Sequence, residues 1–348
     1  MSDTTTDPKK RGPDPSAPPP MHDPTSAQRW DADVALPNPR SNRPVTIGHH
    51  IEAFFAKAFF GLFWLIGLDA SSAFMGKTLR LIGPLLIPIH RRGMDNLDLV
   101  YPTMPREQKR AILKNTWENL GRLFAEFAHL KKLTALSDKP RVEIDGLDKL
   151  QRLSAGAQPI IFVGSHHANW EVMCPALFRA GVKYAFIYRP LNNPILDDTM
   201  INYRAQVMSR HQIPKGKRGG RELIATLKRG LSFATMVDQK LNTGIPSPFL
   251  GHEAMTAPAT ARLALKYNAL IVPLSLRRKS GAYFSMEVHD PIALTPSENV
   301  SADVQRLTDL INVEIGNMVL ENPGQWLWFH RRWPKQAYQL LNPTKGST

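Results

Sequence analysis

Strand-like and helix-like segments alternate between residues 142 and 320, and this alternation constrains the fold more than any other feature. Short apolar segments rich in β-branched and aromatic residues predict strands at 142–144, 159–163, 184–188, 233–237, 270–276 and 283–288. Helical patterns lie between them at 147–153, 170–179, 194–208, 221–228, 258–267 and 302–320, and a further helical pattern begins near residue 105. Such an order is typical of an α/β fold in which helices cover a mainly parallel or mixed sheet. We therefore predict an α/β domain over residues 96–340.

Two segments of different character precede this domain. Residues 1–45 carry ten prolines and few apolar side chains, which predicts a disordered Pro-rich tail because too little surface is available to bury. Residues 46–95 form a hydrophobic helical segment, and within it residues 51–68 are strongly apolar and aromatic. That stretch is marginal for spanning a bilayer, which takes about 20 apolar residues, and suits a helix that lies in the membrane interface. The alternative is a hydrophobic helix packed on the domain itself.

Charge and cysteine content limit the partners and cofactors. The formal net charge of +14 predicts attraction to an anionic partner, which includes nucleic acid, an acidic protein and an anionic membrane surface. The lysines and arginines are dispersed rather than gathered with aromatic residues, so we expect no nucleic-acid partner. Cys174 is the single cysteine, which excludes an intrachain disulfide and a cysteine-based zinc site. Metal-ligand spacings and nucleotide-binding glycine motifs are also missing, so we expect neither a metal nor a cofactor.

The predicted strand at 159–163 leads directly to a candidate catalytic pair, His166 and Glu171. A carboxylate beside one imidazole nitrogen lets the other nitrogen take a proton from a hydroxyl. A five-residue offset on a regular helix separates side chains by about 140°, so the two residues meet only if His166 lies in the turn before the helix. Asn169 is a suitable N-cap for that helix. The alternative is that His166 caps the turn and Glu171 stabilises the positive end of the helix.

Other polar residues follow neighbouring predicted strands. Arg189 comes directly after the strand at 184–188, and Asp238 with Gln239 follows the strand at 233–237. Because sites in parallel sheets gather at the carboxyl ends of strands, we expect these side chains to share one edge with His166.

Several separated blocks, taken together, resemble the late acyltransferases of lipid A biosynthesis, a branch of the lysophospholipid acyltransferase superfamily. His166 and Glu171 occupy the positions of that family's His-X4-Glu/Asp signature, and His167 does not. Further blocks occur in the same order across roughly residues 50–335. They are 117–122 with Glu126, 188–194, 238–240, 248–251 with Ala254 and Thr256, and 325–333. Ala168 is a departure, since the family commonly has glycine there.

The resemblance implies an inner-membrane enzyme that faces the cytoplasm and moves a fatty acyl chain from acyl carrier protein to a hydroxyl of an anionic lipid A precursor. In this mechanism His166 is the general base, Glu171 orients it, and no acyl-enzyme forms. We expect five further residues to line the substrate site: Arg189, Asp238, Gln239, Gly251 and Thr256. Arg189 is the candidate for binding acceptor phosphate or the developing oxyanion, and its alternative role is an ion pair at a strand end.

Other functions remain compatible with parts of this pattern. The same His-X4-Glu chemistry serves acyltransferases that act on glycerol phosphate or a lysophospholipid, with acyl-CoA or acyl carrier protein as donor. A non-enzymatic alternative is a basic adaptor at a membrane. The tryptophans of 325–333 suit either the bilayer interface or a protein core.

Overall fold

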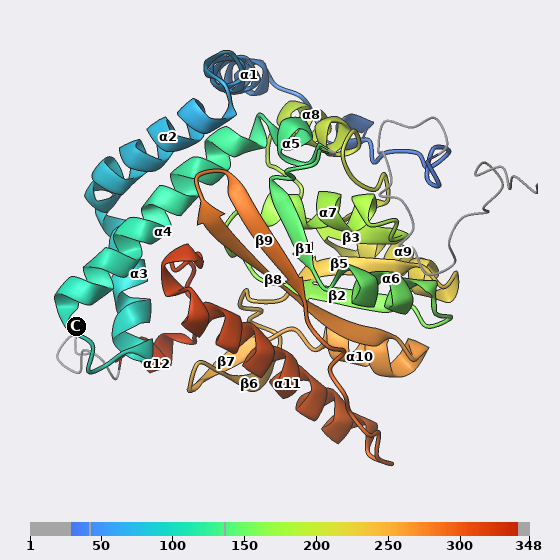
Figure 1. The fold of residues 1–348 in the computed structure, drawn as a ribbon. Coiled ribbons are helices and arrows are strands. Elements are labelled where there is room, and N and C mark those ends of the chain that lie inside the picture. The colour runs from blue at the N-terminus through green and yellow to red at the C-terminus, as the bar shows by residue number, and fades with distance from the viewer. Residues whose placement is uncertain (1–28, 42, 136, 340–348) are drawn as a thin grey trace, which may run out of the picture.

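The computed structural model describes residues 29–339 apart from 42 and 136, and one mixed sheet organises this part of the chain (Figure 1). The strands lie in the order β1-β9-β8-β2-β5-β3-β4. Their bounds are β1 Val142–Asp145, β2 Ile160–Gly164, β3 Tyr184–Tyr188, β4 Gln212–Pro214, β5 Ser232–Met236, β8 Leu270–Ser280 and β9 Tyr283–Val288. Only the β8–β9 pair is antiparallel within this described sheet. The predicted α/β fold with a mainly parallel or mixed sheet is therefore confirmed.

All six predicted strands are present, but three further strands escaped the sequence pattern. β4 has three residues, too few for a period-2 pattern to show. β6 Ile245–Phe249 and β7 His252–Thr256 form a separate antiparallel hairpin. β6 contains two prolines, and proline within an apolar run argues against a strand in a sheet centre. This strand tolerates them because the hairpin has only two strands, so β6 has a free edge.

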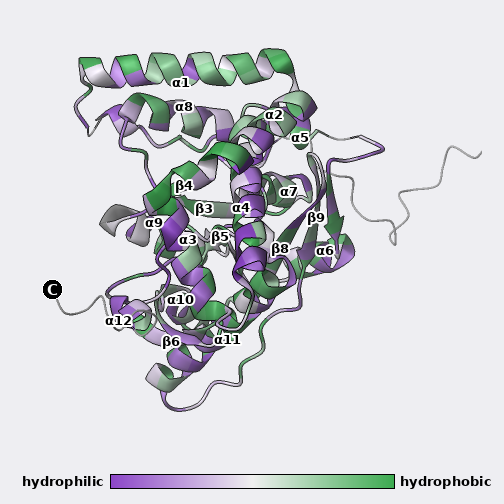
Figure 2. Cartoon of the chain, turned by 90° about the vertical axis from the view of Figure 1, so that its left-hand side faces the viewer, coloured by the Kyte–Doolittle hydropathy of each residue, from purple (hydrophilic) through white to green (hydrophobic). Residues whose placement is uncertain are grey.

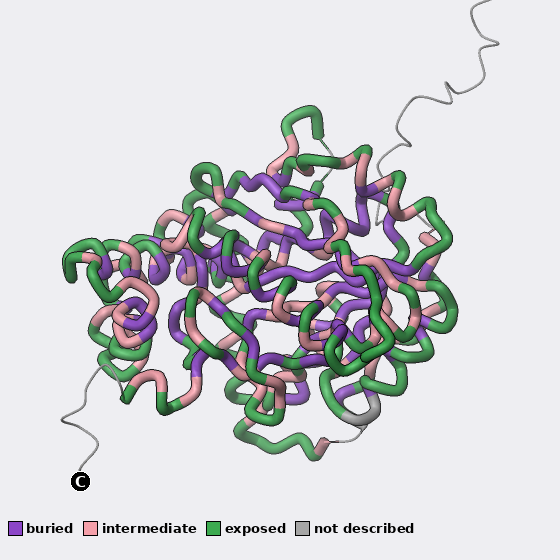
Figure 3. The backbone as a smooth tube through the Cα atoms, turned by 90° about the horizontal axis from the view of Figure 1, so that it is seen from below, coloured by how far each residue is buried: buried purple, intermediate pink, exposed green. Residues whose placement is uncertain are grey.

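Helices cover both faces of the sheet. From β1 onward they are α6 Leu147–Ala155, α7 Met173–Arg179, α8 Pro194–Arg204, α9 Lys217–Lys228, α10 Ala259–Tyr267, α11 Val300–Glu321 and α12 Lys335–Gln339, with 3₁₀-helices η4 Trp170–Val172 and η5 Pro323–Gln325. Along β2, Ile160 and Phe162 belong to one hydrophobic cluster, whereas Ile161 and Val163 belong to the cluster on the other side. Every residue of this central strand is therefore buried. Buried segments, drawn in purple, fill the interior of the molecule in Figure 3.

A separate layer of helices precedes the sheet. Its elements are η2 Pro39–Ser41, α1 Ile47–Ile66, α2 Leu68–Ile82, η3 Gly83–Leu85, α3 Ile87–Val100, α4 Arg106–Phe127 and α5 Leu130–Leu133. Helix α2 lies along α4 (Figure 1). The contact is close, because a Cβ added at Gly121 of α4 would lie 2.2 Å from the Met75 carbonyl oxygen. Glycine at position 121 therefore permits this approach.

Helix α1 is apolar but scarcely packed on the rest of the protein. Ala53 and Phe63 are its buried residues. Figure 2 shows α1 as a largely hydrophobic rod at one edge of the molecule, beside α8. Residues 46–95 thus pack on the domain through α2 and α3, whereas α1 leaves most of its apolar side chains exposed. Among residues 29–339 other than 42 and 136, no helix combines the length and apolarity needed to cross a bilayer.

Residues 29–45, expected to belong to the tail, make specific contacts with the domain. The Asp31 carboxylate is almost fully buried and forms an ion pair with Arg29 at 2.6 Å. The Trp30 ring stacks on His211 at 5.4 Å, and Arg43 forms an ion pair with Asp197 at 2.5 Å. The tail prediction therefore does not hold for these residues. Its remainder, residues 1–28, lies outside the described part.

The tryptophans near the carboxyl end of the described chain belong to the core. Trp326, Trp328 and Trp333 are each at most 1% exposed, and Arg332 beside them is fully buried. The Arg332 guanidinium donates to Thr256 Oγ1 at 2.8 Å. Of the two roles left open by the sequence, a contact with the bilayer interface is thus excluded for these tryptophans.

Candidate active site

The turn between β2 and η4 places His166 at the carboxyl edge of the sheet. Asn169 caps η4 as predicted, because its side chain accepts the Glu171 backbone N–H at 3.2 Å. His166 therefore lies in the turn before the helix. Its imidazole is half-buried, with 17% of the side chain exposed, and meets the Trp170 ring edge to face at 4.9 Å.

Asp238, at the end of the adjacent strand β5, is the carboxylate that holds His166. Its Oδ1 lies 2.7 Å from His166 Nδ1, and its Oδ2 accepts the His166 backbone N–H at 2.9 Å. Trp326 Nε1 donates to the same Oδ2 at 2.8 Å. The three contacts fix the imidazole and place its proton on Nδ1, which leaves Nε2 as an acceptor.

His166 and Asp238 shift each other's pKa in opposite directions. Burial alone would lower the pKa of His166, but the charge and the hydrogen bond of Asp238 outweigh it and raise the pKa above its usual value of 6.5. Burial alone would raise the pKa of the Asp238 carboxyl, yet the charge of His166 and its two hydrogen bonds hold that pKa well below the usual range. Asp238 is therefore ionised at neutral pH and stabilises a protonated His166.

Glu171 does not make the expected hydrogen bond to His166. Its carboxylate instead binds the Arg204 guanidinium of α8 through two contacts, at 2.6 and 3.0 Å. Both side chains are nearly buried, with 13% and 12% exposed. The hydrogen bond predicted between Glu171 and His166 is thus made by Asp238 instead, because Arg204 of α8 binds the Glu171 carboxylate. Its charge still contributes to the raised pKa of His166.

A cavity of about 240 Å³ opens beside His166. Its wall includes His166, Glu171, Arg189 and Arg204, and the rest is largely apolar. Among the apolar residues are Phe162, Met173, Leu177, Phe186, Met208 and Leu274. The arrangement suits a molecule with an apolar chain and a reacting polar end at His166.

Two of the other predicted site residues lie at this edge. Arg189 follows β3, is exposed and lines the cavity with His166. The Gln239 side chain reaches the His166 ring, with 3.4 Å between Gln239 Nε2 and His166 Nε2. The predicted convergence of residues after β2, β3 and β5 is thus confirmed.

Gly251 and Thr256 do not join this group. Gly251 lies in the turn of the β6–β7 hairpin with φ of 80°, and neither residue lines the cavity beside His166. Thr256 is buried, and its hydroxyl binds Asn312 and Arg332. Both residues are held away from the cavity beside His166, because the hairpin packs on α11, and their place in the substrate site stays a prediction.

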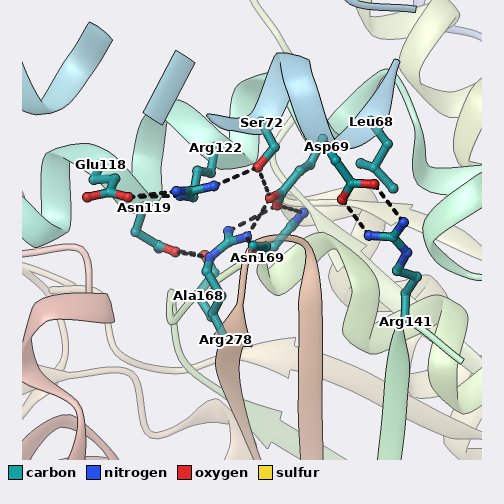
Figure 4. A network of polar contacts seen from close by, with 12 residues as sticks. Leu68, Asp69, Ser72, Glu118, Asn119, Arg122, Arg141, Ala168, Asn169 and Arg278 are labelled. Atoms are coloured by element: carbon teal, nitrogen blue, oxygen red, sulfur yellow. Dashed lines mark hydrogen bonds and ion pairs between the residues drawn. The ribbon is translucent and has the colours of Figure 1, made fainter. Parts of the chain in front are cut away.

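Buried polar residues hold the turn itself (Figure 4). Ala168 has φ of 46°, a left-handed conformation that explains why glycine is common at this position. Its carbonyl accepts from Asn119 of α4 at 2.9 Å, and its N–H donates to the Gln325 carbonyl at 3.0 Å. Next to it, Asn169 donates to the Glu126 carboxylate at 2.9 Å.

Glu126 is fully buried, and its charge is balanced by Arg278 of β8. Arg278 also contacts Asn119 (Figure 4). Ser72 of α2 donates a further hydrogen bond to Glu126 at 2.7 Å. The network thus ties the turn to α2, α4 and β8. No local sequence pattern predicts the roles of Arg204 and Arg278, because their partners Glu171 and Glu126 lie 33 and 152 residues away.

Two other residues near the site, His167 and Cys174, have side chains that could react in principle, but burial makes both unreactive. Burial lowers the pKa of His167 to about 4, so this imidazole is neutral and donates to the Asn322 carbonyl at 3.1 Å. Burial raises the pKa of the Cys174 thiol to about 12, which leaves little thiolate to act as a nucleophile. The fold and the site together place a hydrogen-bonded His–Asp pair beside a largely apolar cavity.

Comparison with known proteins identifies the family. The model of the bacterial lipid A biosynthesis acyltransferases matches residues 47–335, and the chain belongs to this family. It is 24% identical to the lipid A biosynthesis myristoyltransferase of Escherichia coli strain K12 over 72% of this chain and 76% of that protein. Identity to the lauroyltransferase of the same strain is also 24%, over 70% of this chain and 77% of that protein.

Among solved structures, the 1-acyl-sn-glycerophosphate acyltransferase PlsC from Thermotoga maritima covers 82% of this chain and 100% of its own, with 15% identity. Its TM-score of 0.34 is too low to bear on fold or activity. The predicted family is thus confirmed by the family model and the curated relatives, and the protein is an acyltransferase of the lipid A biosynthesis family.

Proposed function

We propose that the protein transfers a fatty acyl chain from the thioester of acyl carrier protein to a hydroxyl of a lipid A precursor. One observation carries the proposal: His166, fixed at Nδ1 by Asp238, presents Nε2 at the edge of an apolar cavity. Nε2 takes the proton of the acceptor hydroxyl while the oxygen attacks the thioester carbonyl. Asp238 stabilises the imidazolium that forms, and Glu171 adds a second negative charge nearby.

The cavity and the surrounding charges support this assignment. An acyl chain fits the apolar wall formed by residues such as Phe162 and Leu177. Arg189 stands at the same cavity and is suited to bind an acceptor phosphate. The net charge of +14 favours both an acidic carrier protein and an anionic lipid acceptor.

The test is product analysis by mass spectrometry with paired donors and acceptors. Acyl carrier protein and CoA thioesters of several chain lengths are each offered with a lipid A precursor, glycerol phosphate or a lysophospholipid. We expect acylated lipid A precursor from the carrier protein thioester, and no product with His166→Ala. The exposed His50 on α1 gives the matched control, and His50→Ala should retain activity. Transfer only to glycerol phosphate or a lysophospholipid would refute the proposed acceptor.

We also propose that α1 attaches the enzyme to the cytoplasmic face of the inner membrane. Six large side chains of this helix are between 52% and 75% exposed, namely Ile51, Phe54, Phe55, Leu62, Trp64 and Leu65. Such a patch is far more apolar than an ordinary protein surface, and it suits burial in the interface of a bilayer. Exposed Arg91 and Arg92 on α3 add attraction to anionic lipid.

Flotation with vesicles that contain anionic phosphatidylglycerol tests the attachment. Replacement of Phe54, Phe55 and Trp64 by serine should release the protein from the vesicles while transfer to a detergent-dispersed acceptor persists. Val313→Ser on α11 removes a 51% exposed apolar side chain elsewhere and should leave flotation unchanged. Undiminished flotation of the triple variant would refute the role of α1.

A further inference from the structure

Gln239 connects His166 to a second imidazole, that of His330. Gln239 Nε2 lies 3.4 Å from His166 Nε2 and 3.4 Å from His330 Nε2. The two rings are 6.1 Å apart between centroids. The sequence assigned no role to His330, although it stands in the block 325–333.

The two partners of this chain come from separate parts of the sequence. Gln239 directly follows Asp238, whose carboxylate binds His166. Asn96 of α3 donates to the His330 carbonyl at 2.7 Å and to the Trp328 carbonyl at 2.6 Å. The side chains of Gln239 and His330 are themselves exposed, which leaves them open to a substrate.

The hydrogen-bond directions of this chain follow from the Asp238 contact. In neutral His166, the form that acts as a base, the proton is on Nδ1 and Nε2 accepts. The Gln239 amide has two N–H groups, so it donates one to His166 Nε2 and the other to His330 Nε2. At 3.4 Å both contacts are long, and a substrate hydroxyl readily replaces the one at His166.

His330 must be neutral to accept a hydrogen bond from Gln239, and its surroundings keep it so. Although solvent reaches the His330 ring, partial desolvation by the surrounding protein lowers its pKa, and the positive charges of His166, Arg189 and Arg92 lower it further, against the opposing charge of Asp238. The effect is largest when His166 is protonated, which is the state in which negative charge develops on the substrate.

We propose that Gln239 donates the hydrogen bond that stabilises the thioester oxyanion, and that His330 is the residue that positions Gln239 for it. This inference rests on the proposed acyl transfer. The acceptor hydroxyl displaces Gln239 from His166 Nε2, and the freed amide N–H turns to the thioester carbonyl oxygen while the other N–H stays on His330.

The acyl transfer proceeds in two steps. In the first, the acceptor oxygen bonds to the acyl carbon, its proton moves to His166 Nε2, and the carbonyl electrons form the oxyanion at Gln239. In the second, the oxyanion collapses, the carbon–sulfur bond breaks, and the thiolate takes the proton from His166 Nε2. The acyl group has moved from sulfur to oxygen, and the proton from oxygen to sulfur.

A double-mutant cycle on kcat tests the assignment. Loss of an oxyanion donor lowers kcat by about 10²–10³-fold, so we expect such a loss for Gln239→Ala with the KM of the donor changed by less than about threefold. His330→Ala should lower kcat by about tenfold or more, because one anchor of the amide is lost. The double variant should be no slower than Gln239→Ala, since His330 acts only through Gln239.

His330→Gln keeps an acceptor for the Gln239 amide and should restore most of the turnover that His330→Ala loses. Additive losses in the double variant, or an effect of His330→Ala on KM alone, would overturn the inference.

His166→Ala in the same assay separates the two proposals. If His166→Ala is inactive while His330→Ala retains full kcat, the inference fails and the proposed function stands. If His166→Ala remains active, the proposed function itself fails.

Discussion

Replacing Asp238 by asparagine tests the hydrogen-bond geometry of the site most directly. Oδ2 of Asp238 accepts two N–H groups, from the His166 backbone and from Trp326, so the asparagine oxygen takes this position. The asparagine NH₂ then occupies the place of Oδ1, 2.7 Å from His166 Nδ1 in the present structure. An NH₂ group there donates to Nδ1, which forces the proton onto Nε2. His166 then has no lone pair at the nitrogen that meets the acceptor hydroxyl.

The expected loss in kcat is about 10⁴-fold, the size found when the same change imposes the wrong histidine tautomer in a serine protease. That factor corresponds to about 5.4 kcal/mol of transition-state stabilisation. The pH profile should move as well. In the native enzyme Asp238 raises the pKa of His166, and without the carboxylate burial lowers it. Since the neutral imidazole is the active form, the acid limb of the residual activity should shift to lower pH.

The assay is kcat for acyl transfer as a function of pH, with the variant's thermal stability as a check on folding. Asp290→Asn is the control, because this aspartate is 86% exposed and pairs only with Lys149 among the described contacts. A kcat within tenfold of the native enzyme, or an acid limb that stays in place, would refute the assignment of Asp238.

Three further predictions concern the surroundings of the turn. Glu126→Gln leaves the nearly buried Arg278 without a full counter-charge and should lower the free energy of unfolding by about 3–5 kcal/mol, measured by urea denaturation. Glu171→Gln breaks the ion pair with Arg204, and both residues line the cavity beside His166. Because this part of the cavity wall then moves, kcat should fall by about tenfold or more while KM does not rise. Ala168→Gly relieves a left-handed backbone and should raise the free energy of unfolding by about 1 kcal/mol with kcat unchanged.

Each of these has an outcome that contradicts it. Unchanged urea stability of Glu126→Gln would mean that the network in Figure 4 contributes little to folding. If Arg204→Met keeps native turnover while Glu171→Gln loses it, Glu171 acts on His166 and not through Arg204. A loss of stability in Ala168→Gly would show that the methyl group matters more than the backbone conformation.

Local patterns in the sequence were sufficient to predict most of the strands and the position of His166 in a turn. The six strands that were predicted have clear apolar runs. β4 was missed because it has three residues, β6 because it contains two prolines, and β7 because His252–Thr256 has no apolar run. Asn169 capped η4 as expected, and His166 lay in the turn, since caps and turns depend on neighbours within a few residues.

The partners of the site residues were decided by the tertiary structure. Asp238 lies 72 residues from His166, and it reaches Nδ1 because β2 and β5 are adjacent parallel strands. Glu171, only five residues away, was drawn instead to Arg204 by the packing of α8. Gly251 and Thr256 were kept from the cavity by the hairpin they belong to.

The sequence by itself therefore determined an α/β domain, the turn that carries His166, and the family. The tertiary structure determined which carboxylate fixes the imidazole, that Trp326, Trp328 and Trp333 are buried, and that α1 exposes its apolar side chains. The physical reason is the separation along the chain between the residues that interact. Backbone conformation follows from adjacent residues, whereas hydrogen bonds and burial depend on strand order and helix packing, which join residues far apart in the chain.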